Sequence, residues 1–354
     1  MKIKIELTEN SYLIYVDYKL NKITNIFKEN KYGNKILIVS DDNVFPLYGN
    51  LIKEGLSTMG KKVFEVILAP GEKTKTFNQL IKIIEVCGKN KMGRDDTILT
   101  LGGGVVSDIG GFASSIYMRG INFVTVPTTL LAQVDASVGG KTAVNLPFGK
   151  NLVGSFYQPS FVYIDLNTLD TLSNKEIKQG ISEIIKYGII KKKQIFDIME
   201  KETVDIKQHY KFLVTESLKI KKDVVEKDEK EKRGLREILN FGHTLGHAIE
   251  ISHFPKFTHG EAVALGMVGE TFISSCIGLC GKDVFYKVKE VVKKWELPFS
   301  FKNIKLEEAL EFLSYDKKVR QGKIRFVLPQ SIGKVKTGVV LTIEEVENFL
   351  KDIG

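Results

Sequence analysis

The sequence predicts an α/β protein with an N-terminal parallel sheet followed by a mainly helical C-terminal domain. Two observations carry this prediction. In the first half, short runs rich in β-branched residues alternate with segments long enough for a helix, which is typical of parallel strands covered on both faces. From about Leu172 these runs give way to long amphipathic segments rich in lysine and glutamate. We therefore expect a hinge near residues 167–175 and two domains, spanning residues 1–171 and 172–354.

Six apolar runs account for the expected strands. The first four end at turn-forming residues such as glycine, proline, aspartate or asparagine. Because an open parallel sheet binds ligands beyond the carboxyl ends of its strands, the binding site is expected at that edge. The runs span residues 36–39, 63–68, 97–101, 123–126 and 161–165 in the first domain and 324–328 in the second.

Composition excludes several classes of function. The 354 residues are 43% hydrophobic and 27% charged, with a net charge of +9. No charge-free apolar run reaches the roughly 18 residues of a membrane span, and the lysine runs lack the clustered arginines and aromatics of a nucleic-acid-binding surface. The positive charge therefore indicates either an anionic small ligand or a solvated lysine-rich surface. The three cysteines form no disulfide framework, which predicts a cytoplasmic protein.

A glycine-rich loop, residues 102–108, follows the third strand and precedes a helical segment. Glycines let the backbone approach a pyrophosphate, and a helix N-terminus supplies N–H groups and a positive dipole. The loop matches G-x-G-x-x-G only if Ser107 stands for the third glycine, and the usual ribose-binding acid about 20 residues later is not evident. A tight structural turn is the alternative. Polar residues at two other strand ends favour a dinucleotide: Asp41, Asn43, Glu72 and Lys75.

Small, polar and basic residues gather in the segment 127–151. Gly139-Gly-Lys-Thr142 resembles the end of a P-loop, but the leading glycine is missing and no apolar strand directly precedes it. We therefore reject a P-loop. Lys141, Lys150 and Asn151 remain candidates for binding an anionic or hydroxylated ligand, with loop capping and surface charge as the alternative.

Four of the five histidines lie between His243 and His259. His243 and His247 are four residues apart, so they share one face of a helix, and His259 follows a break at Pro255. Such a density of imidazoles is typical of a metal site or of proton transfer. Spacing alone pairs His243 with His247. Glu183, which shares a helical face with Lys186, is a candidate third ligand, although such a pair is more often a surface ion pair.

These motifs, in this order, resemble the 3-dehydroquinate synthase family of sugar-phosphate cyclases over about residues 41–329. The resemblance implies a Rossmann-like NAD-binding α/β domain, a mostly helical metal- and substrate-binding domain, one divalent metal ion (zinc, with cobalt as an alternative) and a homodimer. The strongest blocks are residues 102–108, 117–119, 127–151, 183–186, 221–231 and 234–263.

The resemblance also implies roles for individual residues. The implied metal ligands are Glu183, His243 and His259. His247 is then not a ligand, and its implied role is proton transfer. Arg119 is expected to reach the neighbouring subunit's site. The substrate residues are Asp135, Lys141, Asn151, Lys186, Lys221, Arg236, Asn240, His247 and Lys317. The NAD-contacting positions are Asp41, Asn43, Glu72, Lys75, Gly103, Gly104, Val105, Ser107, Asp108, Thr128, Thr129, Lys141, Lys150, Thr168 and Thr171.

The implied reaction converts 3-deoxy-D-arabino-heptulosonate 7-phosphate to 3-dehydroquinate and phosphate, a step of the shikimate pathway. Oxidation of the C5 hydroxyl by NAD acidifies the C6 proton, so that phosphate can leave; the hydride is then returned and the ring opens and closes. Lys141, Asn151 and Arg119 of the partner subunit are expected to hold the phosphate. Lys221 and Arg236 are expected to hold the carboxylate. His247 is the proton-transfer candidate, with Asn240 and Asp135, and the departing phosphate is a candidate base.

The chain departs from the family pattern in three places. Ser107 stands where many members have glycine, Pro70 occupies a common aspartate position, and one extra residue lies between Glu231 and Gly234. The extra residue leaves Lys221 or Lys222 as the substrate lysine; we prefer Lys221, counted from the nearer landmark at residues 224–225.

Three other functions compete with this interpretation. Other cyclases of the family share the cofactor and metal, but the basic and polar set described above favours a carboxylate-bearing substrate. A metal-dependent polyol dehydrogenase would accumulate NADH. A metal- and nucleotide-binding regulatory protein would not need a complete set of acid–base groups.

Overall fold

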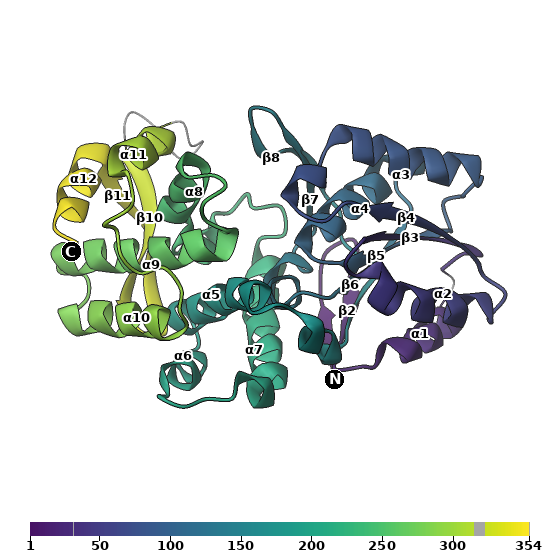
Figure 1. Cartoon of the computed structure of the whole chain (residues 1–354), viewed down its shortest axis with the longest axis horizontal. Coiled ribbons are helices and arrows are strands. Elements are labelled where there is room, and N and C mark those ends of the chain that lie inside the picture. Colours follow the sequence, from purple (N-terminus) through teal and green to yellow (C-terminus); the bar gives the residue numbers. More distant parts are fainter. Residues whose placement is uncertain (31, 315–322, 354) are drawn as a thin grey trace. The chain divides into compact units, whose positions relative to one another are not determined.

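The structure, a computed structural model, describes residues 1–30, 32–314 and 323–353 (Figure 1). The chain divides into two compact units. The first comprises Met1–Leu172 and Lys221–Lys230, and the second comprises Ser173–Ile220 and Glu231–Gly354. The chain therefore returns to the first unit for ten residues after it has entered the second.

The first unit contains a seven-stranded sheet in the order β1-β2-β9-β6-β5-β3-β4. All neighbouring pairs of strands are parallel except the pair β1–β2, which is antiparallel. The five strands predicted for this region are all present, and the α/β class is confirmed. The strand β1, at one edge of the sheet, and its neighbour β2 were not predicted. The strands are β1 Lys2–Ile5, β2 Tyr12–Val16, β3 Lys35–Asp41, β4 Lys62–Leu68, β5 Thr97–Gly102, β6 Asn122–Pro127 and β9 Phe161–Ile164.

Helices cover both faces of this sheet (Figure 1). Helices α1 (Ile23–Glu29) and α2 (Asn50–Ser57) pack on one face, where Ile36 and Ile38 point. Helices α3 (Phe77–Lys89) and α4 (Gly104–Ile116) pack on the other, with Leu37 and Val39. Because successive side chains of a strand point to opposite faces, burial on both sides explains why the strands are continuous apolar runs.

The position of α4 depends on small residues. A Cβ atom added at Gly110 would lie 2.2 Å from Cγ2 of Thr100 in β5, and one at Gly111 would lie 2.5 Å from Cγ2 of Thr142. Gly110 therefore allows the helix to approach β5, and Gly111 allows it to approach the strand that contains Thr142, more closely than any side chain would permit. This packing holds the N-terminus of α4 at the carboxyl end of β5.

A two-stranded antiparallel hairpin, β7 (Lys141–Leu146) and β8 (Gly149–Phe156), completes the first unit. The sequence did not predict these strands. Lys141 is paired with Phe156 at one end of the hairpin, whereas Leu146 is paired with Gly149 at the other. Lys150 and Asn151 therefore lie near the turn, away from Lys141 along the strands.

The second unit is mainly helical, as predicted, and the run 324–328 lies within an antiparallel strand pair. The C-terminal part of α7 lies in the segment that belongs to the first unit. The helices are α5 Asn174–Ile190, α6 Lys193–Glu200, α7 Ile206–Lys227, α8 His243–Ser252, α9 His259–Cys276, α10 Lys282–Lys294, α11 Leu306–Ser314 and α12 Ile343–Lys351, and the strands are β10 Lys323–Ser331 and β11 Lys334–Thr342.

Within the described ranges, none of the helices combines the length and apolar character needed to span a membrane. Cys87, Cys276 and Cys280 are free thiols.

Candidate active site

The glycine-rich loop connects β5 to α4 as the sequence predicted. Gly103 is the N-cap residue, and α4 begins at Gly104. A Cβ atom at Gly103 would lie 3.1 Å from Cγ2 of Thr129, so the loop packs tightly against the segment that follows β6. The first N–H groups of a helix have no intrahelical acceptor and carry partial positive charge. The loop can therefore receive a phosphate through its backbone.

Ser107 faces the sheet. It is buried, and its hydroxyl lies 3.1 Å from Oγ1 of Thr125 in β6, within hydrogen-bond distance. The third glycine of a dinucleotide-binding loop normally permits close helix–strand packing. Here Ser107 occupies that position and forms a hydrogen bond, while Gly110, which lies outside the glycine-rich loop, closely approaches Thr100 of β5.

A hydrogen-bonded network connects several predicted residues of the first unit. The ammonium group of the buried Lys75 forms a close ion pair with Asp108 and donates to Oδ1 of Asn151. Asn145 links this group to Glu72: its Nδ2 donates to Oε1 of Glu72 at 2.7 Å, and its Oδ1 accepts from the N–H of Asn151 at 2.9 Å. Burial raises the pKa of Asp108, and Lys75 opposes that shift. Sequence reasoning missed Asn145, because nothing marks it apart from its place in the hairpin.

Lys221 and Lys222 are consecutive residues with different environments. Nζ of Lys221 is 2.8 Å from Oδ1 of Asp135 and donates to its backbone oxygen at 2.6 Å. Lys222 instead forms an ion pair with Glu226, one turn later in the same helix, at 2.8 Å. The structure therefore brings Lys221, and not Lys222, to the predicted substrate residue Asp135.

The remaining predicted residues of the first unit lie mostly at strand ends. Oδ1 of Asp41 accepts hydrogen bonds from the N–H groups of Asn43 and Val44, both at 2.9 Å, and burial raises its pKa. Lys141 and Asp108 line a small cavity. Val105 is half-buried in the first turn of α4, and Thr128 is buried. The hydroxyl of Thr129 accepts a hydrogen bond from the N–H of Ala132, and that of Thr168 accepts one from Gln133. The hydroxyl of Thr171 lies 2.7 Å from that of Tyr48.

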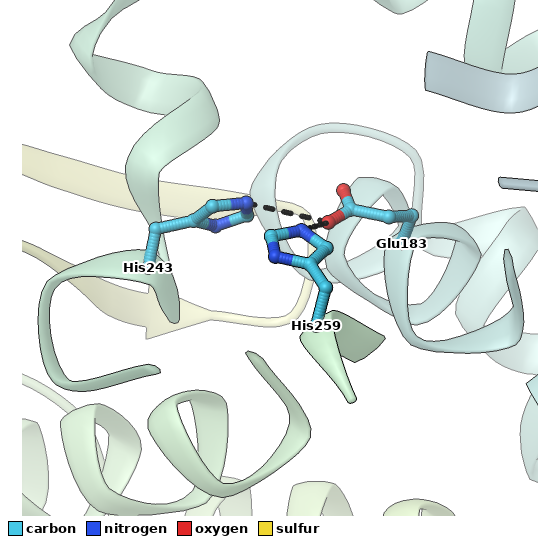
Figure 2. Close-up of side chains that lie close together, drawn as sticks. All are labelled: Glu183, His243 and His259. Carbon is cyan, nitrogen blue, oxygen red and sulfur yellow. Dashed lines mark ion pairs between the residues drawn. The ribbon is translucent and has the colours of Figure 1, made fainter. Parts of the chain in front are cut away.

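In the second unit, Glu183 of α5, His243 of α8 and His259 of α9 converge (Figure 2). Oε1 of Glu183 is 3.3 Å from Nε2 of His243 and 3.5 Å from Nε2 of His259. Ligand atoms held about 2.0 Å from a tetrahedral zinc ion stand about 3.3 Å apart. The spacing of these atoms therefore fits one metal ion.

Glu183 is fully buried; its Oε2 forms a close ion pair with Nζ of Lys186, and its Oε1 faces the rings of His243 and His259. Burial alone would raise the pKa of this carboxyl, but the ammonium of Lys186 and the imidazole of His243 hold it well below its usual range. A buried ionised carboxylate is costly unless cationic partners accompany it. Lys186 supplies one at Oε2, while Oε1 is turned to the two imidazoles. The donor set thus fits a divalent metal.

Each histidine presents its other ring nitrogen to a protein oxygen. Nδ1 of His243 is 3.0 Å from the carbonyl oxygen of Phe241, and Nδ1 of His259 is 3.2 Å from Oε2 of Glu250. Burial lowers the pKa of His243. Burial alone would also lower the pKa of His259. The carboxylates of Glu183 and Glu250 outweigh that effect and raise the pKa to about 10. Sequence reasoning missed Glu250, although it lies seven residues after His243, on the same helical face.

His247 lies beside the other two imidazoles. Its ring centroid is 5.2 Å from that of His243 and 5.9 Å from that of His259. A second group of potential ligand atoms, from His247, Glu250 and His259, also lies within 4.8 Å. Spacing predicted that His243 and His247 would bind one metal together, but neither group contains both residues. His243 is in the first group and His247 in the second, and His259 is in both.

Glycines bring α8 and α9 into backbone contact. A Cβ atom at Gly266 would lie 1.9 Å from the carbonyl oxygen of Gly242, and one at Gly246 would lie 3.0 Å from that of Ala262. The carboxylate of Glu270, fully buried in α9, accepts hydrogen bonds from the N–H groups of Gly242 at 2.6 Å and Leu245 at 3.1 Å. Glu270 therefore binds the N-terminal end of α8, the first residue of which is His243.

Replacing Glu270 with glutamine is expected to lower the free energy of unfolding by about 2 kcal/mol, because the amide NH₂ leaves one buried N–H donor without an acceptor. The measurement is urea denaturation in the presence of a chelator, so that metal binding does not contribute. Glu290→Gln on α10, whose side chain is 67% exposed, is the matched control. A loss below about 0.5 kcal/mol for Glu270→Gln would contradict this account.

The last predicted residues occupy varied positions. Arg236 is buried and Asn240 half-buried in the short 3₁₀ helix Leu235–Asn240 that precedes α8. Lys186 is buried beside Glu183. Arg119 is exposed at the end of the turn Tyr117–Arg119. Lys317 lies outside the described residues.

Two family models match the chain in succession. The 3-dehydroquinate synthase N-terminal model matches residues 65–179, and the 3-dehydroquinate synthase C-terminal model matches residues 180–319. A 3-dehydroquinate synthase of Caldanaerobacter subterraneus subsp. tengcongensis is 42% identical over 353 residues, which covers 98% of both chains. The chain belongs to the 3-dehydroquinate synthase family. The predicted family and enzyme class, a phosphate-eliminating cyclase of the lyase type, are confirmed.

Solved structures of related cyclases share the fold of this family member. The 2-epi-5-epi-valiolone synthase from Streptomyces hygroscopicus subsp. jinggangensis, with NAD⁺ and Zn²⁺ bound, has a TM-score of 0.90 at 26% identity and 98% coverage of both chains. A 2-deoxy-scyllo-inosose synthase complexed with carbaglucose-6-phosphate, NAD⁺ and Co²⁺ has a TM-score of 0.87 at 23% identity and 99% coverage of both. The identity to the 3-dehydroquinate synthase is well above either value.

Proposed function

We propose that this protein converts 3-deoxy-D-arabino-heptulosonate 7-phosphate to 3-dehydroquinate and phosphate in the shikimate pathway, using NAD and one divalent metal ion. The observation that carries the proposal is the convergence of Glu183, His243 and His259 in a chain of this family. We also propose that the domains defined from the sequence, residues 1–171 and 172–354, bind the cofactor and the metal respectively, and that the protein acts in the cytoplasm.

Glu183, His243 and His259 are the proposed ligands of the metal, for which we propose zinc. Two imidazoles and one carboxylate are a ligand set that leaves zinc an open position for substrate. When bound, NAD would accept and return the C5 hydride while the metal polarises the C4 and C5 oxygens. The relative with NAD⁺ and Zn²⁺ bound supports this choice, and the Co²⁺ complex supports cobalt as a working substitute.

The first unit provides the proposed NAD site. The N-terminus of α4, at Gly103 and Gly104, would receive the pyrophosphate through backbone N–H groups. Asp41, at the end of β3, is the proposed partner of a ribose hydroxyl. The network around Lys75 and Asp108 would orient the rest of the cofactor. The other proposed contacts are Asn43, Glu72, Val105, Ser107, Thr128, Thr129, Lys141, Lys150, Thr168 and Thr171.

The proposed substrate residues bind the anionic ends of the molecule and move protons between them. Lys221 and Arg236 would hold the carboxylate, and Lys141 and Asn151 would hold the phosphate. Fixing both ends orients the C5 hydrogen for transfer. His247 would exchange a proton with the substrate, supported by Asn240 and Asp135. Lys186, beside Glu183, and Lys317 complete the proposed set.

We propose a homodimer in which Arg119 of the partner subunit completes the phosphate site. The glycine loop lies at the N-terminus of α4, and Arg119 follows its C-terminus, 13 residues and therefore about 20 Å further along the helix axis. Nε of Arg94, which precedes β5, donates to the carbonyl oxygen of Met118, which puts this turn at the amino edge of the sheet. An exposed arginine at this edge, flanked by the exposed Ile116 and Met118, is well placed to serve another subunit.

Lys221→Ala is expected to lower kcat/KM by about 10- to 100-fold, since a charge-assisted bond to the carboxylate is lost. Lys222→Ala is the matched control and should stay within about twofold of the wild type, because Lys222 pairs with Glu226 on the same helix. Steady-state kinetics with thermal melting of both variants make the comparison. A larger loss in Lys222→Ala than in Lys221→Ala would overturn the assignment.

A further inference from the structure

The two metal-site histidines have different oxygen acceptors behind them. Both rings turn Nε2 toward Oε1 of Glu183. The other ring nitrogen of His243, Nδ1, lies 3.0 Å from a neutral acceptor, the carbonyl oxygen of Phe241. Behind His259 stands a carboxylate, Oε2 of Glu250, at 3.2 Å from Nδ1. His259 therefore lies between two carboxylates, one at each ring nitrogen.

We infer that Glu250 is a positioning residue for the metal site: it accepts the Nδ1–H of His259 and so leaves the Nε2 lone pair directed at the metal. A hydrogen bond at one imidazole nitrogen fixes the tautomer and the ring orientation, and a carboxylate acceptor also makes the ligand more basic. This inference rests on the proposed metal site formed with Glu183 and His243.

The position of Glu250 suits this task. It lies on α8, whereas His259 is the first residue of α9, so the contact links two helices. The backbone contacts at Gly246 and Gly266 fix the distance between these helices. Glu250 is only 8% exposed, which limits the competition of water for its carboxylate. The ring of His259, with 31% of its side chain exposed, has more freedom and more need of an anchor.

The alternative is that Glu250 is itself a ligand, together with His247 and His259. A metal there would take Nδ1 of His259 and leave Oε1 of Glu183, which faces Nε2 of both His243 and His259, without a metal. The fully buried charge of Glu183 would then rely on its ion pair with Lys186 at Oε2. A metal at Glu183 compensates that charge and keeps the bond between His259 and Glu250.

The test is metal affinity rather than activity. Zinc binding to the full-length apo-protein is measured at fixed pH by competition with a chromogenic chelator, for the wild type, Glu250→Gln and Glu250→Ala. We expect Glu250→Ala to bind zinc about 10- to 100-fold more weakly. Glu250→Gln, which keeps an acceptor oxygen but no charge, should fall between the alanine variant and the wild type.

Three comparisons make the result decisive. Glu261→Gln is the matched control. Glu261 lies in the first turn of α9, two residues after His259, but its carboxylate accepts hydrogen bonds from Thr258, so zinc affinity should be unchanged. The visible spectrum of the Co²⁺-loaded Glu250→Gln protein should match that of the wild type, because no ligand is lost. Thermal melting of the apo-proteins verifies that they fold.

Zinc affinity of both Glu250 variants within about twofold of the wild type would overturn the inference. So would a changed Co²⁺ spectrum with an affinity loss as deep as that of Glu183→Ala, since Glu250 would then be a ligand. Failure of the folded wild type itself to bind zinc or cobalt would instead overturn the proposed metal site.

Discussion

His259→Ala is expected to lose metal and turnover together while the protein stays folded. His259 supplies one of three proposed ligand atoms, and the loss of even an outer contact costs about 10- to 100-fold in metal affinity, so the loss of a ligand should exceed 100-fold. The fold should persist because the side chain is partly exposed and the capping box of Thr258 and Glu261 still begins α9. Metal analysis after dialysis, circular dichroism and steady-state kinetics give the three readouts.

His209→Ala is the matched control for this substitution. His209 lies on α7, outside both groups of potential ligand atoms, so the variant should keep its metal and its rate. If His259→Ala retained a full complement of metal and turned over at the wild-type rate, His259 would not be a ligand.

Arg119→Ala and Arg236→Ala, each nearly inactive alone, are expected to regain activity when their subunits are mixed. In a mixed dimer, the subunit that keeps Arg236 receives Arg119 from its partner, so one of the two sites is complete. Random reassortment of equal amounts should restore about a quarter of wild-type activity. Each variant alone should lose about 100-fold or more, since misplacing one end of the substrate removes its alignment.

Subunits with different affinity tags allow the mixed dimers to be isolated and assayed. The control pairs Arg119→Ala with the double variant Arg119→Ala/Arg236→Ala, which cannot assemble a complete site in any combination. Mixed dimers of the two single variants that stayed inactive would show that Arg119 does not act across the interface.

The central strands were predictable because they are buried on both faces. Residues 36–39 are a continuous apolar run, and residues 97–101 are apolar or threonine; a run of that kind between helix-length segments has few other interpretations. The outer strands β1 and β2 carry a weaker signal: β1 alternates exposed and buried residues over only four positions. The hairpin of β7 and β8 is rich in glycine, lysine and asparagine, which disguise a strand pair.

The family pattern pointed to Glu183, His243 and His259 as metal ligands, whereas spacing alone pointed to His243 with His247. Helical spacing detects neighbours on one helix, but the proposed ligands come from α5, α8 and α9. The contacts that support them are still harder to predict. Glu250 and Glu270 are glutamates in helices, where glutamate is common, and only the close packing of α8 on α9 shows what they bind.

The proposed reaction is tested by following phosphate release. The zinc-loaded protein is given 3-deoxy-D-arabino-heptulosonate 7-phosphate and a catalytic amount of NAD, and absorbance is recorded at the NADH band. We predict equal amounts of phosphate and 3-dehydroquinate with no net NADH, because the hydride returns within each turnover. Accumulating NADH would indicate a dehydrogenase, and no phosphate from folded, metal-loaded, NAD-bound protein would contradict the proposed reaction.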